Sequence, residues 1–319
     1  MIEVKNLTKR YGNHLAVDHL NFTVESGKIY GFLGPNGAGK STTMNIMTGY
    51  LGATEGQVLI DGHDILKEPE EAKKNIGYLP EIPPLYMEMT VREYLEFAAE
   101  LKGIKKDKRE PQIEEVIRLA KLRDVENRLI QNLSKGYKQR VGLAQAVLGF
   151  PEIIILDEPT VGLDPKQIIE IRELIRKLAK KHTVILSSHI LAEVREVCDY
   201  IMIISGGKLV ASDTTENLEN MMSGKGQIKV EAKASRDEMD HIIRRTGKIK
   251  EVKYRTSASG ITTAQIIAKG GEDIREELFL AFSHADVPML TLNQSKTTLE
   301  EIFLELTQGS GNRMIKGEK

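Results

Sequence analysis

The first 85 residues of the chain consist of short runs of alternating apolar and polar residues, separated by turn-forming pairs. Four runs alternate in this way, IEVKNL, HLNFTV, KIYGFL and QVLI, and Ser-Gly, Glu-Gly and Asp-Gly pairs stand between them. A period of two places every second side chain on one face of a strand, and glycine-containing pairs are typical of turns. This part of the chain is therefore predicted to be rich in short strands.

The spacing of apolar residues changes from residue 86 to about 150. Three segments now carry apolar residues three or four positions apart, VREYLEFAAEL, QIEEVIRLAKL and KQRVGLAQAVLGF. Around the last of them, Tyr137, Val141, Ala144 and Leu148 recur at this spacing. The spacing is that of one face of an α-helix, so we expect a helical subdomain over residues 86–150.

Two uninterrupted apolar runs follow, IIIL from Ile153 and TVIL from Thr183, and the amphipathic segment IIEIRELIRKLAKK separates them. Strands without polar alternation are buried on both faces, and their alternation with helices is typical of a parallel sheet in an α/β domain. A hairpin, IMIIS-GG-KLVAS, ends this region. The first domain is therefore expected to cover residues 1–212.

The remaining residues predict a second, smaller domain. After an expected linker at 213–224, residues 225–308 predict the order strand, helix, strand, strand, helix, strand, which is the order of a ferredoxin-like α+β fold. Ser235 and Glu238 have the spacing of a capping box before the first helix. A further helix is expected behind Thr298, and the tail at 309–319 is expected to be disordered.

Composition limits the classes of protein that remain. The 319 residues include 45 Lys and Arg against 46 Asp and Glu, and a formal net charge of -1 gives no sign of nucleic-acid binding. The single cysteine, Cys198, excludes an internal disulfide and suits a reducing compartment. The apolar runs are far shorter than the roughly 20 residues that cross a bilayer. Any role at a membrane would therefore require a partner that spans it.

The segment GPNGAGKST matches the P-loop pattern and directly follows the strand-like KIYGFL. Its glycines let successive backbone N–H groups face phosphate, and the helix that follows adds the positive end of its dipole. Lys40 is expected to reach the β- and γ-phosphates, and the Ser41 hydroxyl to bind Mg²⁺. The alternative is a glycine-rich turn with an unrelated lysine, which the strand before and the helix after disfavour. The predicted phosphate-binding residues are Gly34, Asn36, Gly37, Ala38, Gly39, Lys40, Ser41 and Thr42.

Candidate catalytic residues stand where the two apolar strands end. Asp157 and Glu158 follow the first strand, and carboxylates beside a phosphate loop can hold Mg²⁺ and polarise the attacking water. We expect Asp157 to hold the metal and Glu158 to act as general base. His189 follows the second strand and can contact the γ-phosphate, although a single histidine in such a place is more often structural. Ser134 is expected to cap a helix whose first backbone groups Gly136 leaves accessible.

Together and in this order, these segments resemble the ATPase domain of ABC transporters over residues 1–212. The resemblance rests on the P-loop, an LS-x-G signature, an aliphatic strand ending in Asp-Glu, and the switch histidine. It implies an α/β fold of the P-loop NTPase type with an antiparallel β subdomain, a parallel-sheet core and a helical subdomain. It further implies ATP as the nucleotide, Mg²⁺ as its metal and ATP hydrolysis as the reaction.

The resemblance also assigns roles to individual residues. Tyr11 would stack on adenine, although the residue pattern alone fits a surface tyrosine equally well. Ser134 and Gly136 would contact ATP held by a second subunit, and Asp164 in GLDP would link the two sites across the dimer. The catalytic residues that the resemblance implies are Lys40, Glu158 and His189.

Two segments depart from the family's commonest pattern. The signature reads LSKGY instead of LSGGQ, with Lys135 and Tyr137 in place of a glycine and the glutamine. Similar variants occur in drug and lantibiotic exporters, which favours export over import. Glu81, in GYLPE, stands where the family usually has glutamine. It would either ligate Mg²⁺ or turn away to pair with a basic side chain of the membrane partner, and the second alternative avoids repulsion from Asp157 and Glu158.

The resemblance finally implies partners. Because one set of motifs is present, a working unit needs a second copy of this chain or a related ATPase subunit, together with polytopic permease subunits that hold the chain at the cytoplasmic face of the cell membrane. Apart from the resemblance, the C-terminal domain is expected either to pair with its counterpart or modulate opening of the dimer, or simply to pack against the ATPase domain. The alternatives are a ribosome-associated ABC protein, a chromosome or repair ATPase, and a nucleotide-binding regulator without hydrolysis. The first normally carries two motif sets, the second a long coiled coil, and the third would not need Glu158 and His189.

Overall fold

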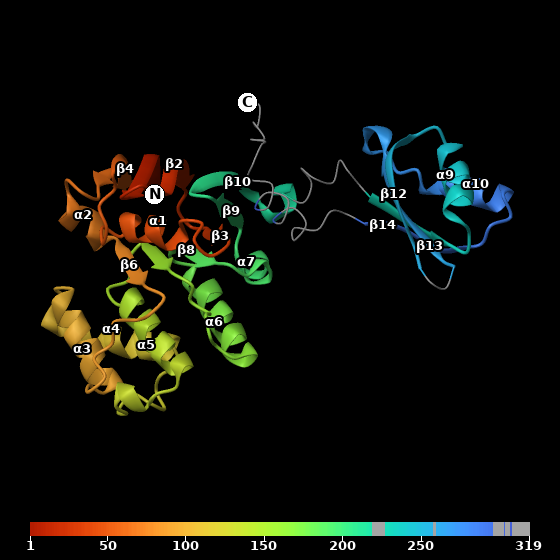
Figure 1. Cartoon of the computed structure of the whole chain (residues 1–319). Coiled ribbons are helices and arrows are strands. Elements are labelled where there is room, and N and C mark those ends of the chain that lie inside the picture. Colours follow the sequence, from red (N-terminus) through yellow and green to blue (C-terminus); the bar gives the residue numbers. More distant parts are fainter. Residues whose placement is uncertain (219–226, 258–259, 296–302, 304–306, 308–319) are drawn as a thin grey trace. The chain divides into compact units, whose positions relative to one another are not determined.

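The computed structural model describes residues 1–218, 227–257 and 260–295, together with Phe303 and Thr307. The chain forms two compact units, built on Met1–Thr214 and on Thr215–Gln308 (Figure 1). The expected disordered tail at 309–319 lies outside the described residues, and so does most of the helix expected behind Thr298.

An antiparallel sheet begins the first unit and has the order β2-β1-β4-β5. In β1, Ile2 and Val4 are buried whereas Glu3 and Lys5 are not, as the alternation predicts. The second strand is longer than predicted, because His14, Leu15 and Val17 pair with β1 although this stretch lacks strict alternation. The strands are β1 (Ile2–Tyr11), β2 (His14–Val24), β4 (Glu55–Ile60) and β5 (His63–Asp64).

The second sheet of this unit has the order β10-β9-β3-β8-β7-β6 and is parallel except for β10. Its strands β3, β7 and β8 are buried throughout, as the apolar runs predict. They end on the same edge of the sheet, immediately before the P-loop, Asp157 and His189. The strands are β3 (Ile29–Leu33), β6 (Ile76–Leu79), β7 (Ile153–Leu156), β8 (Thr183–Ser188), β9 (Tyr200–Ser205) and β10 (Lys208–Thr214).

One core joins the two sheets through helix α1 (Lys40–Met47). The buried side chains of Met44 and Met47 belong to the same cluster as Ile2 of the antiparallel sheet and Ile155 of the parallel sheet. Figure 1 shows α1 between the two sheets. The helix that carries the phosphate loop at its N-terminus is therefore fixed from both sides.

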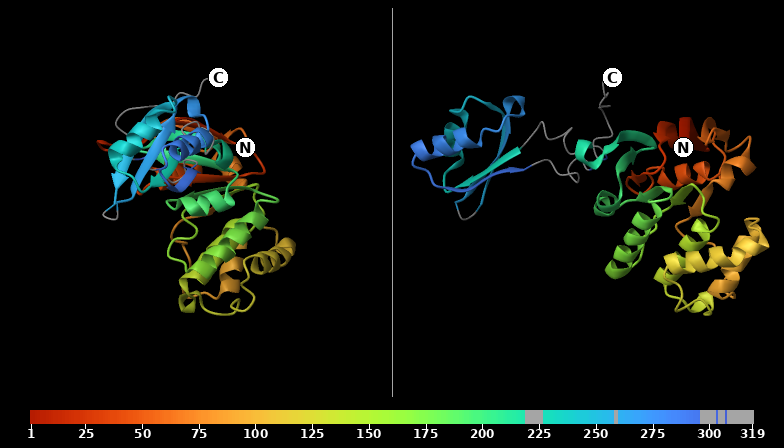
Figure 2. Two further views of the ribbon diagram at one scale, coloured as in Figure 1. Left: turned by 90° about the vertical axis from the view of Figure 1, so that its right-hand side faces the viewer. Right: turned by 180° about the vertical axis from the view of Figure 1, so that it is seen from behind.

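A group of helices lies to one side of the sheets, coloured yellow to yellow-green in both views of Figure 2. It consists of α3 (Val91–Leu101), α4 (Lys106–Leu119) and α5 (Lys135–Val147), with the 3-10 turn Ile130–Asn132. Helix α3 has the predicted bounds. Within the described part of the chain, no helix combines the length and apolarity that a membrane crossing requires.

Helix α4 begins six residues before the predicted start at Gln112. The prediction rested on apolar spacing, which the charged residues 106–110 lack, and on Pro111, which cannot donate a helix hydrogen bond. The extra turn is held by side chains instead, because Arg92 of α3 donates to Glu110 at 2.9 Å and Arg109 donates to the Ile104 carbonyl at 2.8 Å.

The remaining helices of the first unit are α2 (Pro69–Lys74), α6 (Pro165–Leu178) and α7 (Leu191–Val197). The expected linker at 213–224 begins differently in the structure, since β10 runs to Thr214 and residues 215–218 are helical. Pairing of Asp213 and Thr214 with β9 accounts for the difference. The rest of that segment lies outside the described residues.

The second unit has the β-α-β-β-α-β order that the sequence predicts. Its antiparallel sheet has the order β12-β13-β11-β14, and Figure 1 shows α9 and α10 on one face. The hydroxyl of Ser235 caps α9 by accepting from the Glu238 N–H at 3.3 Å. The elements are β11 (Gln227–Ala232), α9 (Arg236–Arg244), β12 (Ile249–Thr256), β13 (Thr262–Ala268), the 3-10 turn Lys269–Gly271, α10 (Arg275–His284) and β14 (Met289–Ser295).

A separate apolar core predicts that residues 215–308 fold when expressed alone. Phe282 of α10 is fully buried in this core, whereas Phe279 on the same helix is 57% exposed. In the isolated fragment, Phe282→Ala should lower the free energy of unfolding by about 3–5 kcal/mol. The matched change Phe279→Ala should alter it by no more than about 0.5 kcal/mol. Chemical denaturation followed by circular dichroism measures both, and a fragment with a random-coil spectrum would contradict the prediction.

Candidate active site

The phosphate loop connects β3 to α1 and leaves the start of the helix open. Gly39 is the N-cap of α1, and no side chain caps the helix there. Its φ of 104° lies in the left-handed region, and a Cβ atom at this position would stand 2.5 Å from the Ala16 carbonyl oxygen, so only glycine fits. The first backbone N–H groups of α1 are thereby free to bind an anion, and the helix dipole favours a negative charge.

Lys40 lies within this loop and is 5% exposed. Its Nζ donates to the carbonyl oxygens of Gly34 at 2.8 Å and Pro35 at 3.3 Å. The same atom is 3.4 Å from Glu158 Oε1. A buried ammonium group needs such partners, because burial without them is costly. The charge of Lys40 therefore stands between the phosphate loop and the proposed general base.

Asp157 ends β7 and faces the start of α1. Its Oδ1 accepts hydrogen bonds from Ser187 Oγ at 2.5 Å and from Ser41 Oγ at 3.2 Å. Ser187 Oγ in turn accepts from the Glu158 N–H at 2.8 Å. Burial raises the pKa of Tyr78, and the negative charge of Asp157 raises it further. The hydroxyl of Ser41 and the carboxylate of Asp157 are hard oxygen donors side by side, so these residues fit Mg²⁺.

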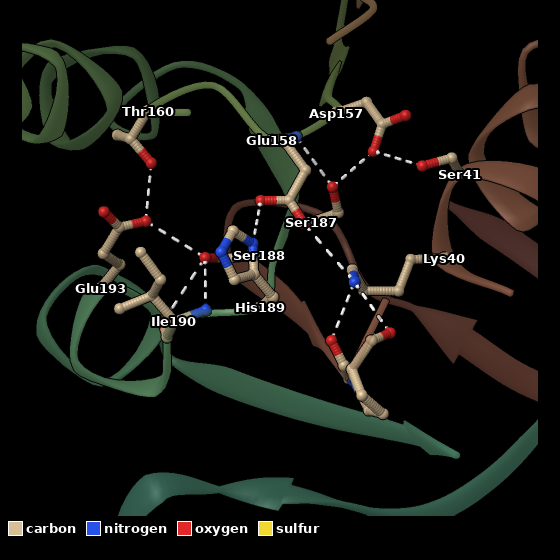
Figure 3. A network of polar contacts seen from close by, with 12 residues as sticks. Lys40, Ser41, Asp157, Glu158, Thr160, Ser187, Ser188, His189, Ile190 and Glu193 are labelled. Carbon is tan, nitrogen blue, oxygen red and sulfur yellow. Dashed lines mark hydrogen bonds and ion pairs between the residues drawn. The ribbon is translucent and has the colours of Figure 1, made fainter. Parts of the chain in front are cut away.

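Glu158 and His189 form a pair at the carboxyl edge of the sheet (Figure 3). Glu158 Oε2 is 3.0 Å from His189 Nδ1. The Glu158 side chain is 8% exposed and that of His189 is 40% exposed, so the histidine is the member of the pair that faces solvent. Glu158 has a φ of 47°, a left-handed conformation that costs a non-glycine residue energy and that clusters at functional sites.

Lys40, Glu158 and His189 line one open cavity of about 480 Å³, whereas Asp157 and Ser187 are not among its lining residues. Tyr11 lies in its wall and is 48% exposed, and Glu81, also exposed, lines it too. The structure thus brings the phosphate loop together with Glu158 and His189, which follow the two apolar strands. Tyr11 and Glu81, whose roles the sequence defined least, line the same cavity. The cavity is lined by Tyr11, His14, Ala16, Asn36, Gly37, Gly39, Lys40, Ser41, Thr42, Glu81, Glu158, Val161 and His189.

The signature residues lie elsewhere, where α5 and α6 begin side by side. Ser134 caps α5 by accepting from the Tyr137 N–H at 3.5 Å, and Asp164 caps α6 by accepting from the Gln167 N–H at 2.9 Å. A Cβ atom on Gly136 would stand 2.5 Å from the amide end of the Gln167 side chain, so a larger residue there would require that side chain to move. Gly136 and Asp164 line a second depression of about 370 Å³.

The two unusual signature residues have partners within this chain. Tyr137 donates to Asp124 at 2.6 Å, and this hydrogen bond raises the pKa of the Tyr137 hydroxyl. The Lys135 ammonium lies over Gly162, at 2.2 Å from where a Cβ atom of that residue would be. Lys135 thus covers the loop that leads to Asp164, and the Tyr137 side chain is held toward Asp124.

Sequence reasoning missed a set of polar residues behind the cavity. Ser187 bridges Asp157 and the backbone of Glu158. Glu193, in the first turn of α7, accepts hydrogen bonds from Thr160 and Ser188 (Figure 3). Ser187 and Ser188 directly precede His189 in the chain, and this position was a usable signal. Glu193 offered none, because it reads as an ordinary polar residue in a short amphipathic helix.

Comparison with known proteins extends these observations. The ABC transporter family matches residues 17–161. The bacitracin transport ATP-binding protein of Bacillus licheniformis is 43% identical over 221 residues, which are 69% of this chain and 71% of that protein. The linearmycin resistance ATP-binding protein of Bacillus subtilis (strain 168) is 31% identical over 308 residues, which are 96% of this chain and 98% of that protein.

A solved structure supports the same conclusion. The dimeric structure of an ATP-binding cassette in a post-hydrolysis state, bound to ADP and Pi, is similar with a TM-score of 0.61 and 28% identity, and the match covers 67% of this chain and 98% of that one. The fold, the P-loop and the catalytic edge agree with this similarity. The resemblance inferred from the order of the motifs is confirmed: the chain is an ATP-binding, ATP-hydrolysing member of the ABC transporter family.

Proposed function

We propose that this chain hydrolyses ATP, with Mg²⁺, to drive an exporter in the cell membrane. The observation that carries the proposal is the meeting of Lys40, Glu158 and His189 in one cavity beside the open N-terminus of α1. That arrangement offers positive charge for the phosphates and a carboxylate for the attacking water. It supports hydrolysis rather than a regulator that only binds nucleotide.

ATP would lie along the cavity from Tyr11 to the phosphate loop. The exposed ring of Tyr11 is available for stacking on adenine. The backbone N–H groups at the start of α1 would receive the phosphates, and Lys40 would exchange the Gly34 and Pro35 carbonyls for phosphate oxygens. The phosphates would then separate Lys40 from Glu158, so binding would free the carboxylate from its ion pair.

Ser41 and Asp157 would hold Mg²⁺ beside the phosphates. When bound, Mg²⁺ supplies neutralisation of the charge that develops on the transferred phosphoryl group. Asp157 is held in place by Ser187, which fixes its Oδ1 toward Ser41. We propose that Glu81, although it lines the same cavity, turns toward a basic residue of the membrane partner instead of joining this set.

Glu158 would accept a proton from the attacking water, and His189 would contact the γ-phosphate. The left-handed backbone of Glu158 and its N–H bond to Ser187 aim the carboxylate across the cavity. The contact between Glu158 Oε2 and His189 Nδ1 keeps both side chains at the same point. These roles need no movement of the sheet, because both residues follow buried strands.

The complete site would form between two subunits. Gly136 and Asp164 line a depression separate from the cavity that holds the phosphate loop, and Ser134 caps the helix that starts there. Two chains facing each other head to tail would place the start of α5 of one against ATP held by the other. Negative phosphate between two positive helix ends would draw the pair together, and hydrolysis would release it.

The direction of transport and the partners are inferred from the relatives. One relative is named for bacitracin transport and another for linearmycin resistance, and export of a toxic compound is the simplest common activity. Polytopic permease subunits would hold the chain at the cytoplasmic face of the membrane. Residues 1–212 would be the ATPase domain and residues 225–308 an accessory domain, shared with the relative that matches 96% of this chain.

Replacement of Glu158 by Gln should abolish most hydrolysis while leaving ATP binding intact. The amide keeps the size of the side chain but cannot accept the proton, so the rate should fall about 10²- to 10⁴-fold. The closed dimer should then accumulate with ATP, which size-exclusion chromatography detects. Glu152→Gln, an exposed change at the other end of β7, is the matched control and should leave the rate unchanged. Hydrolysis by Glu158→Gln at the original rate would refute the assignment.

The change Glu81→Gln should leave the Mg²⁺ dependence of the isolated subunit almost unaltered and weaken stimulation by the permease. The expected reason is that Glu81 pairs with a basic side chain of that partner rather than with the metal. ATPase activity is measured against Mg²⁺ concentration for both forms, with and without permease. Asp157→Asn serves as the comparison and should raise the Mg²⁺ midpoint strongly. A similar rise for Glu81→Gln would make Glu81 a metal ligand.

A further inference from the structure

A buried carboxylate behind the cavity connects the segments that carry Glu158 and His189, two of the three proposed catalytic residues (Figure 3). Glu193 is 6% exposed. Its Oε2 accepts hydrogen bonds from Thr160 Oγ1 at 2.6 Å and from Ser188 Oγ at 3.1 Å. Ser188 Oγ also accepts from the Ile190 N–H at 3.0 Å. One oxygen atom of α7 thus binds both the segment after β7 and the last residue of β8.

The two hydroxyl donors lie close in the sequence to Glu158 and His189. Thr160 follows Glu158 by two residues, and Ser188 directly precedes His189. Strands β7 and β8 pair with each other up to Leu156 and Leu186, whereas Ser188 at the end of β8 pairs with β3 and Thr160 lies beyond the end of β7. A buried carboxylate must have hydrogen-bond donors, because its desolvation is otherwise costly. The requirement of Glu193 for both hydroxyls therefore sets the spacing between the two segments.

The pairing of Glu158 with His189 depends on that spacing. Glu158 has a left-handed backbone, which persists only where the surrounding structure holds it. Ser187 holds the Glu158 N–H on one side, and Thr160 with Glu193 holds the chain two residues further on. The 3.0 Å contact between Glu158 Oε2 and His189 Nδ1 lies between these two anchors.

We propose that Glu193 is a positioning residue for ATP hydrolysis. Through Thr160 and Ser188 it holds Glu158 and His189 at the distance at which both reach the γ-phosphate and the attacking water. The inference rests on the proposed roles of Glu158 and His189. Among the described residues, those that line the nucleotide cavity do not include Glu193, so its effect on the reaction is indirect.

Steady-state ATPase assays of the full-length chain test this role. Glu193→Ala should lower kcat by up to about 10²-fold, the loss expected when reacting groups are misplaced by about 1 Å. The dissociation constant of a non-hydrolysable ATP analogue should stay within about twofold, since the phosphate loop is untouched. Glu193→Gln keeps an oxygen that both hydroxyls can reach and should restore most of kcat. Equal losses in Ala and Gln, or a loss of analogue binding, would overturn the proposal.

A double-mutant cycle separates positioning from a general effect on the fold. If Glu193 acts through the Glu158–His189 pair, Glu193→Ala added to His189→Ala should cost little further activity. Losses that multiply would overturn the proposal. Glu196→Ala is the control on the same helix, because Glu196 pairs with Arg172 and its side chain is 50% exposed. Its kcat should equal that of the unchanged chain.

A second variant covers the case in which Glu193→Ala fails to fold. Thr160→Val removes one donor without changing side-chain size, and it should lower kcat with unchanged analogue binding. If Glu193→Ala does not fold, full activity of Thr160→Val would by itself refute the inference. Glu158→Gln is assayed in parallel: if it remains active, the proposed function fails, whereas its inactivity beside an active Glu193→Ala shows that only this inference fails.

Discussion

The ends of three neighbouring parallel strands determine where chemistry can occur in this protein. Strands β3, β8 and β7 are hydrogen-bonded side by side and buried along their whole length, so the segments that follow them must emerge at one edge. Polar residues cannot lie inside the strands without partners. Lys40, Asp157 and His189 are therefore brought to a common line by the sheet itself, and loops of few residues suffice to aim them.

Charge balance is the second constraint on this edge. Lys40, Asp157 and Glu158 are each less than 10% exposed, and three buried charges require mutual compensation. The structure provides it through the Lys40–Glu158 contact, the backbone carbonyls around Lys40 and the serine hydroxyls around Asp157. This arrangement is well suited to a ligand that brings its own negative charge and its own cation, because both can replace partners already in place.

The secondary structure could be predicted from the sequence where buried, apolar positions recur at a regular spacing along the chain. The apolar run from Ile153 to Leu156 is β7, and the periodic segment from Val91 to Leu101 is α3. The charged start of α4 was not predictable, because Arg92 holds Glu110 from another helix. The extension of β10 to Thr214 likewise depends on pairing with β9. Contacts between different elements produce no regular spacing of residues in the sequence from which they could be predicted.

In the candidate site, too, residues within contiguous motifs could be predicted from the sequence, whereas a residue that acts through distant partners could not. The P-loop and the Asp157–Glu158 pair are contiguous motifs, so their meeting at one edge of the sheet could be predicted from their places after strands. The roles assigned to these residues stay predictions. Glu193 could not be found in this way, because its partners Thr160 and Ser188 are 33 and 5 residues distant and the network exists only once the sheet has formed.

The two depressions of the chain are separate, and the proposed head-to-tail pairing of two chains rests on that separation. The start of α5 offers backbone N–H groups near Gly136, yet the structure directs them to a depression lined by α5 and α6 rather than to the phosphate loop. Each chain would therefore use one face to hold ATP and another to complete the site of its partner. Lys135 and Tyr137 are engaged with Gly162 and Asp124 of their own chain. The departures from the usual signature therefore shape the surface around Ser134 and Gly136 and leave both residues in place.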